Sequence, residues 1–287
     1  EFVITGTAGK FSGLDLGYYL IDSSMGALCG LTTTNPDASI NAKNGSPTID
    51  KQVKEDSTDQ WGISNTADIG QNIEYRVTIT VQAGAQDYIL HDQMSDGLTF
   101  DKVTKVEYDG TNYTDTVGTK THYEVVTNNG FTGDCANCDF HIVFTDDFCN
   151  LLSAGKSLII TYEATLNENA KIAENESNSA KLEFGVDHFT TEKETTTSTY
   201  AFDLVKTDGQ NFLLDGAKFK LYVKTGTDVQ GKDVFEQVPL TKVTNTDGTF
   251  YYRPAVATEI NDDTKLQTAL AEFEVEDGII RFQGFDP

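Results

Sequence analysis

Basic residues are scarce in this sequence, which has 21 lysines and arginines against 45 aspartates and glutamates and a net charge of −24. So acidic a surface repels nucleic acid and anionic lipid, and neither is expected as a partner. The sequence also lacks an apolar run long enough to span a bilayer and a recognisable signal peptide. We therefore expect no membrane insertion of this chain, which is either intracellular or a trimmed piece of an exported protein.

Methionine occurs twice and tryptophan once, and no helical pattern of apolar residues continues beyond about a dozen positions. Threonine, valine, tyrosine and phenylalanine are plentiful instead, and these residues favour strands. Hydrophobic residues make up 38% of the 287 positions and are spread along the chain. The composition therefore predicts a mostly β protein with two or more domains, each with its own core.

Cysteines are few, and two of the four form a Cys-x-x-Cys pair at Cys135 and Cys138. Together with His141 and Cys149 this pair would supply three thiolates and an imidazole, a set that can bind zinc. No second Cys-x-x-Cys pair follows, and the segment has the pattern of a β-hairpin. A local disulfide in an exported protein, or free thiols including Cys29, is the favoured interpretation, so no metal or cofactor site is predicted.

The stretch between residues 45 and 188 contains short runs of apolar residues separated by glycine, asparagine and aspartate turns. These runs are Ile73–Val81, Tyr88–His91, Lys102–Tyr108, Tyr123–Val126, Phe140–Phe144, Ser157–Thr165 and Ala180–Phe184. Strands at this spacing are typical of an antiparallel sandwich of immunoglobulin type. The predicted fold class is therefore all-β, with tandem immunoglobulin-like β-sandwich domains and a middle domain at 45–188.

The flanking segments predict a partial domain on each side of this sandwich. Residues 1–44 show short β segments and glycine turns that lead into a polar connector, and a similar pattern returns at Glu276–Pro287. The threonine-rich segment Thr190–Tyr200 has few apolar residues and marks the second boundary, and its pattern also fits an edge strand. We therefore expect the remnant of a first domain with its linker at 1–44, and a third domain at 189–287 that is truncated at its carboxyl-terminal end.

Lys51 is the residue around which the middle domain is organised. Ile49, Lys51 and Val53 alternate with polar residues, so in a strand the lysine shares a face with two apolar side chains. Burying an ammonium group there is costly unless a neighbour neutralises it, although a lysine at a strand end often keeps its head in water. Lys206 alternates with apolar residues in the same way at the start of the third domain, which favours a shared role.

A buried lysine amine becomes a nucleophile when its apolar surroundings lower its pKa. A carboxylic acid kept protonated in the same pocket can polarise an asparagine amide, so that attack by the lysine expels ammonia and leaves an isopeptide bond. Asn178 shares one face of a predicted strand with Ala180 and Leu182, and Asp92 ends an apolar strand. Asn178 and Asp92 also fit a turn residue and a strand-end cap, so the pattern alone leaves both roles open.

Three motifs closely resemble the middle domain of Gram-positive sortase-assembled backbone pilins. They are Pro-Thr-Ile-Asp-Lys-Gln-Val around Lys51, His-Asp-Gln-Met-Ser-Asp-Gly-Leu-Thr-Phe around Asp92, and Asn-Ser-Ala-Lys-Leu from Asn178. The resemblance implies isopeptide-crosslinked immunoglobulin-like domains of CnaA and CnaB type. It also implies an isopeptide bond between Lys51 and Asn178 that Asp92 promotes.

The flanking segments carry the resemblance further. Residues 202–222 look like the start of a CnaB-type pilin domain, which makes Lys206 a possible third-domain isopeptide lysine, and Gly13–Ile21 resembles the late hairpin of a first pilin domain. The glutamate and asparagine partners of Lys206 are expected beyond Pro287. The family also carries a sortase-acceptor lysine before its second domain, and Lys43 in Asn-Ala-Lys-Asn takes that place, although a Tyr-Pro pair is missing before it.

The function implied by the resemblance is that of a structural shaft subunit in an extracellular, cell-wall-anchored pilus, joined by sortase to other pilin subunits. The bond-forming step occurs once per chain, so an enzyme with turnover is not expected. The alternative is a cell-surface adhesin module that binds a host ligand through sandwich loops, with insertions at Thr111–Thr121 and Asn128–Asp139. Lys43 distinguishes the two, because a shaft subunit needs an acceptor lysine and a tip adhesin does not.

Overall fold

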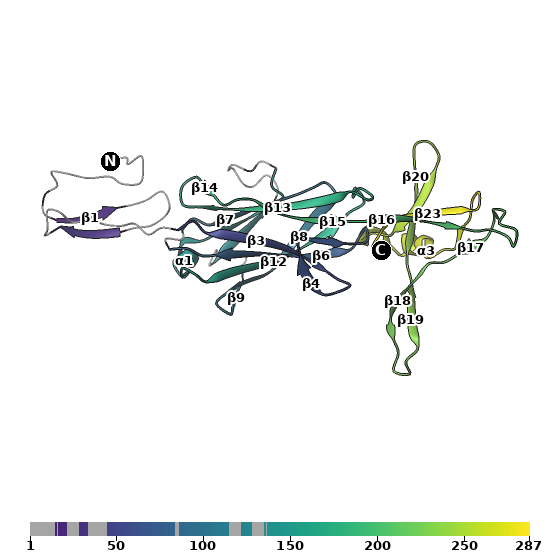
Figure 1. Cartoon of the computed structure of the whole chain (residues 1–287), viewed down its shortest axis with the longest axis horizontal. Coiled ribbons are helices and arrows are strands. Elements are labelled where there is room, and N and C mark those ends of the chain that lie inside the picture. The colour runs from purple at the N-terminus through teal and green to yellow at the C-terminus, as the bar shows by residue number, and fades with distance from the viewer. Residues whose placement is uncertain are drawn as a thin grey trace.

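The computed structural model describes residues 15, 17–21, 29–33, 45–83, 86–114, 122–127, 135 and 137–287. Strands β1 (Gly17–Ile21) and β2 (Cys29–Thr33) pair antiparallel as a two-stranded sheet. A large β-sandwich follows, and a second, smaller β unit comes after it (Figure 1). The prediction of an all-β chain is confirmed.

The sandwich consists of two mainly antiparallel sheets packed face to face (Figure 1). One sheet has seven strands: β10 (Tyr123–Thr127), β11 (Phe140–Phe144), β7 (Ile89–Met94), β13 (Asn175–Phe184), β15 (Lys193–Ser198) and β5 (Ser64–Thr66) in order, with β14 (His188–Phe189) paired to β13. The other has six, in the order β4 (Gln60–Gly62), β3 (Thr48–Glu55), β6 (Asn72–Thr80), β12 (Ser157–Leu166), β8 (Leu98–Tyr108) and β9 (Thr111–Tyr113). A one-turn helix, α1 (Asp146–Cys149), joins β11 to β12.

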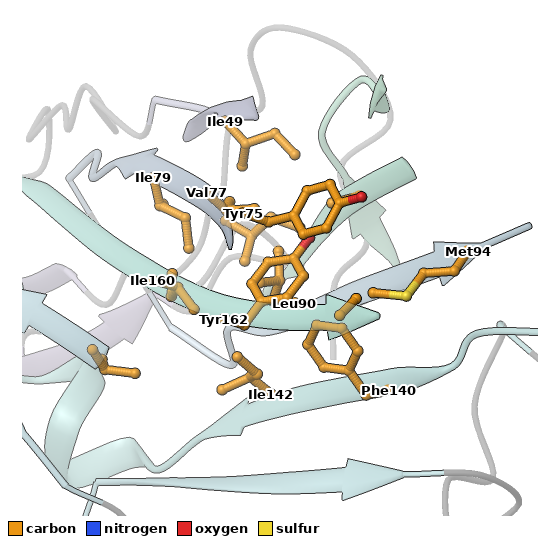
Figure 2. Packing of buried hydrophobic residues seen from close by; sticks show 14 of the residues in the cluster. Ile49, Tyr75, Val77, Ile79, Leu90, Met94, Phe140, Ile142, Ile160 and Tyr162 are labelled. Carbon is orange, nitrogen blue, oxygen red and sulfur yellow. The ribbon is translucent and has the colours of Figure 1, made fainter. Parts of the chain in front are cut away.

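Alternation of apolar residues explains which face each strand buries. In β6, Ile73, Tyr75, Val77 and Ile79 are buried, whereas the residues between them are half-exposed. This is the period-two pattern of a strand with one face in the core. The inward side chains of both sheets form one continuous hydrophobic cluster (Figure 2), and each fully buried aliphatic side chain stabilises the fold by about 1.5–3 kcal/mol.

The sandwich continues past the predicted boundary at residue 188. Strand β15 pairs antiparallel with β13 and parallel with β5, so the segment up to Ser198 belongs to this sheet. Thr195 and Thr197 are each 1% exposed, although the strand has no aliphatic or aromatic side chain. Threonine is β-branched and suits a strand, and its hydroxyl can be satisfied inside: Thr197 donates a hydrogen bond to Asn65 Oδ1 at 2.7 Å.

The second β unit is built on a four-stranded sheet in the order β16 (Tyr200–Val205), β23 (Ile279–Phe285), β21 (Phe250–Pro254) and β20 (Leu240–Thr244). Two ribbons accompany it, β17 (Lys218–Phe219) with β22 (Phe273–Glu274) and β18 (Tyr222–Thr227) with β19 (Asp233–Gln237). Two short helices, α2 (Ala257–Ile260) and α3 (Asp263–Ala269), follow β21. None of the helices in the described part of the chain is long and apolar enough to cross a membrane.

The two units meet where the chain end of the second unit returns to the sandwich. Ile69 donates a backbone hydrogen bond to Gly284 at 2.8 Å, and the backbone amide of Asp286 donates to the Asp68 carboxylate at 2.7 Å. Gly284 has a φ of +82°, and a Cβ placed on it would lie 2.4 Å from Cδ1 of Ile69. Glycine is therefore required at this position for two reasons, backbone conformation and the closeness of the sandwich.

Gly284→Ala should consequently destabilise the second unit more than Gly248→Ala. Gly248 has a φ of +86°, but a Cβ added to it would have no atom within 4 Å, so its substitution costs only the left-handed backbone strain of about 1–2 kcal/mol. Gly284→Ala adds overpacking against Ile69, about 1–3 kcal/mol more. Scanning calorimetry should show the lower unfolding midpoint for Gly284→Ala. Equal midpoints for the two variants would contradict a close junction.

Candidate functional site

Lys51 lies in β3 on the side that faces the core. It pairs with Val77 of the neighbouring strand β6, and its side chain has no exposed surface. Ile49 and Val53, two residues before and after it, are also buried. The alternation read from the sequence therefore places the amine between the two sheets and not at a wet strand end.

Asp92 and Asn178 reach the same region from the opposite sheet. Strands β7 and β13 are neighbours, and Asp92 pairs with Ala180, so Asn178 lies two residues along on the same face. Both side chains are fully buried. The structure thus brings together the three residues that the sequence predicted, one from the six-stranded sheet and two from the seven-stranded sheet.

Tyr162 connects these three side chains. The Lys51 amine donates a hydrogen bond to Asp92 Oδ2 at 2.6 Å and another to the Tyr162 hydroxyl. That hydroxyl donates to Asp92 Oδ2 at 2.7 Å and accepts from Asn178 Nδ2 at 3.1 Å. A phenol has one donor and two acceptor positions, so the hydroxyl of Tyr162 is fully used.

Sequence reasoning missed Tyr162, although a signal was present. In β12 the tyrosine occupies an inward position in the series Leu158, Ile160, Tyr162, Ala164 and Leu166. A buried tyrosine hydroxyl nearly always has a hydrogen-bond partner, so a tyrosine inside an apolar stripe indicates a polar group nearby. Its ring stacks on Tyr75 of β6 with centroids 5.4 Å apart (Figure 2).

Burial sets the protonation of the pair formed by Lys51 and Asp92. It lowers the pKa of Lys51, an effect that the nearby Asp92 carboxyl group only partly opposes. Burial likewise raises the pKa of Asp92, against the opposing effect of Lys51. The 2.6 Å contact fits an ion pair or a neutral amine beside a neutral acid, and both pKa directions favour the neutral pair because the core is a poor solvent for charge.

Two oxygen atoms of the site have no hydrogen-bond partner among the described residues. They are Oδ1 of Asp92 and Oδ1 of Asn178, and both are buried. Unpartnered buried acceptors are rare and costly. A proton on the free oxygen of Asp92, directed at the amide oxygen of Asn178, would satisfy both atoms and withdraw electrons from the amide carbon. The buried site therefore brings together an amine whose pKa is lowered, a carboxyl group whose pKa is raised, and an amide with an unpartnered oxygen.

The structure says less about the two other predicted lysines, Lys43 and Lys206. Lys43 lies outside the described residues. Lys206 follows β16, is half-buried, and donates to the backbone oxygen of Thr207 at 3.4 Å. Its amine forms no ion pair with any carboxylate in the described part of the chain.

The cysteines are arranged differently from the zinc set considered above. Cys135 and Cys138 form a disulfide. Cys149 is a buried free thiol in α1, and burial raises its pKa to about 11. The residues that gather with Cys135 and Cys138 are His141, which belonged to the zinc set considered above, and His91, which the sequence pattern did not indicate.

The solved structures provide the comparison for this arrangement. The chain superposes on the 35 kDa C-terminal fragment of the major pilin GBS80 of Streptococcus agalactiae with a TM-score of 0.55, 17% identity, and coverage of 84% of this chain and 80% of that fragment. The chain has a major-pilin fold. It therefore shares the tandem immunoglobulin-like sandwiches of that protein, with the site of Lys51 inside the sandwich between residues 45 and 198.

Two further backbone pilins are similar at lower scores. The T6 backbone pilin of Streptococcus pyogenes has a TM-score of 0.46 at 19% identity, with 87% of this chain and 57% of that chain covered. The major pilin SpaD of Corynebacterium diphtheriae has a TM-score of 0.46 at 19% identity, with 90% and 76% covered. No protein-family model and no curated protein sequence matches the chain.

Proposed function

We propose that this chain is a structural subunit of a pilus shaft and that an isopeptide bond between Lys51 and Asn178 closes its sandwich. The observation that carries the proposal is the buried cluster of Lys51, Asp92, Tyr162 and Asn178, which links the two sheets through 2.6–3.1 Å contacts. The major-pilin fold supports the shaft role. The residues of the cluster support the bond independently of the fold.

The reaction uses groups that the fold has already placed. A proton moves from the Lys51 ammonium group to Asp92, which leaves a neutral amine beside a carboxylic acid. The amine attacks the Asn178 amide carbon while protonated Asp92 donates a hydrogen bond to the amide oxygen. The Nζ–Cγ bond forms, the Cγ–Nδ2 bond breaks, and the proton lost by the lysine nitrogen passes through Asp92 to the departing group, which leaves as ammonia.

Tyr162 positions the reactants in this scheme. Its hydroxyl contacts the Lys51 amine, the Asp92 carboxyl group and the Asn178 amide nitrogen, which becomes the leaving group. Burial raises the pKa of Tyr162 well above its ordinary value, so the hydroxyl stays protonated and neutral. The chain consumes its own amine and amide, so the reaction occurs once and the protein is not an enzyme with turnover.

The polymer is proposed to form through Lys43 and sortase, with other pilin subunits as partners on an extracellular, cell-wall-anchored pilus. Lys43 precedes β3 by a short connector, so a bond at Lys43 would transmit load into the strand that carries Lys51. We propose the domain order 1–44, a middle sandwich from 45, and a third domain whose lysine is Lys206. An adhesin module remains the competing function, and the acceptor test below separates the two.

The covalent bond can be tested by mass spectrometry. The intact mass of the chain should be lower by one ammonia, after correction for the two hydrogens lost in the Cys135–Cys138 disulfide. Peptide mapping should give a branched peptide that joins Lys51 to Asn178. Full recovery of both linear peptides would contradict the bond.

Peptide mapping also tests whether Asp92 is the acid that promotes the bond. Asp92→Ala should leave the sandwich folded but without the branched peptide, because the acid is needed to take the lysine proton and polarise the amide. Asp96→Ala, in the turn after β7, is the matched control and should crosslink fully. Tyr162→Phe should crosslink more slowly, because positioning is reduced while the proton donor is kept.

A polymerisation assay tests the acceptor lysine. Incubation of full-length subunits with the cognate pilin sortase should give covalent ladders, and Lys43→Ala should abolish them. Lys54 is a nearby lysine whose amine lies 2.6 Å from the Asp59 carboxylate, and the control variant Lys54→Ala should still form the ladders. Ladders that persist in Lys43→Ala would place the acceptor elsewhere, and wild-type protein that forms none would favour the adhesin.

A further inference from the structure

Two of the four histidines and two of the four cysteines of the chain lie together on the outer side of the seven-stranded sheet. His91 in β7 pairs directly with His141 in β11. Their neighbours Leu90 and Ile142 belong to the core, so the imidazoles project from the opposite face. His91 is nevertheless 1% exposed and His141 3% exposed, which is unusual for polar side chains on the outer face of a sheet.

The Cys-x-x-Cys pair lies next to these two imidazoles. One ligand atom from each of His91, Cys135, Cys138 and His141 can be chosen so that all four lie within 4.8 Å of one another. Tetrahedral zinc with bond lengths of about 2.3 Å to sulfur and 2.0–2.1 Å to nitrogen has ligand atoms about 3.3–3.8 Å apart. Once the disulfide is reduced, its two sulfurs would move apart to this spacing, and modest side-chain movements would complete the tetrahedron.

Glu183 provides a second, independent indication of a metal site. Its Oε2 lies 2.7 Å from Nε2 of His91. A carboxylate at this distance holds the proton on Nε2 and fixes the ring, which leaves the lone pair of the imidazole on Nδ1. Histidines that bind metals commonly have one nitrogen on the metal and the other donating to a carboxylate, and this arrangement also raises the basicity of the ligand.

We propose that His91, Cys135, Cys138 and His141 form a Cys2His2 site for Zn²⁺ when the two cysteines are reduced, and that the Cys135–Cys138 disulfide is the metal-free state of the same site. A thiol reductant supplies two electrons and two protons to open the disulfide into two thiols. Zn²⁺ then binds both sulfurs as thiolates and releases those two protons. Soft thiolate ligands together with imidazoles in a tetrahedral set suit the borderline-soft Zn²⁺ and select it over Mg²⁺ or Ca²⁺.

The disulfide form and the zinc-bound form would differ in which parts of the chain they connect. The disulfide joins Cys135 only to Cys138. Zinc would join the same two cysteines to β7 through His91 and to β11 through His141, the strands that pair at this point. His91 immediately precedes Asp92, so the metal would also fix the strand that carries the proposed acid.

The test is metal binding by the full chain in both redox states. Protein reduced with a phosphine and desalted without oxygen should bind one Co²⁺ per chain and show the visible absorption of tetrahedral thiolate-bound cobalt. Zn²⁺ should displace the cobalt, since zinc binds such sites more tightly. The disulfide form should not show this spectrum.

Variants separate this site from other metal-binding groups. Cys135→Ser with Cys138→Ser should lose the spectrum, whereas Cys29→Ser with Cys149→Ser, which leaves the same number of thiols, should keep it. Glu183→Gln should keep the spectrum but weaken Zn²⁺ binding about 10- to 100-fold. Circular dichroism checks that each variant retains its β structure.

Two results would overturn the proposal. One is the absence of a tetrahedral cobalt spectrum in the reduced wild-type protein. The other is a spectrum that survives the loss of both Cys135 and Cys138, which would assign the metal to other ligands.

Discussion

The contact between the Lys51 amine and the Asp92 carboxyl group, 2.6 Å long and fully buried, is the feature on which the middle sandwich depends. Two separate charges in this position would cost several kcal/mol each in lost hydration. Transfer of one proton from the lysine to the acid removes both charges without changing the total number of bound protons. The same transfer produces a nucleophile and a proton donor, so the proton transfer that relieves the cost of burial also prepares the proposed crosslinking reaction. Tyr162 completes the arrangement, because its hydroxyl contacts the amine, the acid and the Asn178 amide.

The sequence predicted the parts of this site that follow from alternation within one strand. Ile49, Lys51 and Val53 indicated an inward lysine, and the Asn178 series indicated an inward amide, because a strand has a period of two. Tyr162 was missed because the Asp92 carboxyl group and the Asn178 amide that it contacts lie in the opposite sheet. The arrangement of distant strands cannot be read from the pattern of one strand. The same limitation applies to His91, which meets the Cys-x-x-Cys pair only because β7 pairs with β11.

The end of the sandwich was harder to predict than its core. Strand β15 consists of polar and charged residues, so the sequence indicated a domain boundary or an edge strand, yet Thr195 and Thr197 are buried and the strand lies between β13 and β5. This strand changes how the crosslink would carry load. Residues between Lys51 and Asn178 would lie inside the proposed covalent loop, whereas residues 179–184 of β13 and all of β15 would lie outside it. Tension that enters before β3 and leaves after β15 would bypass the loop but could still extract these last strands.

Single-molecule pulling of the full chain tests this account most directly. In the wild-type protein the sandwich should release only the segment from residue 179 to residue 198, about 20 residues or roughly 70 Å of contour length. Lys51→Met, which keeps the side-chain volume but removes the amine, should release the whole sandwich, about 150 residues or roughly 500 Å. Release of the longer length by the wild-type protein would contradict a bond between Lys51 and Asn178.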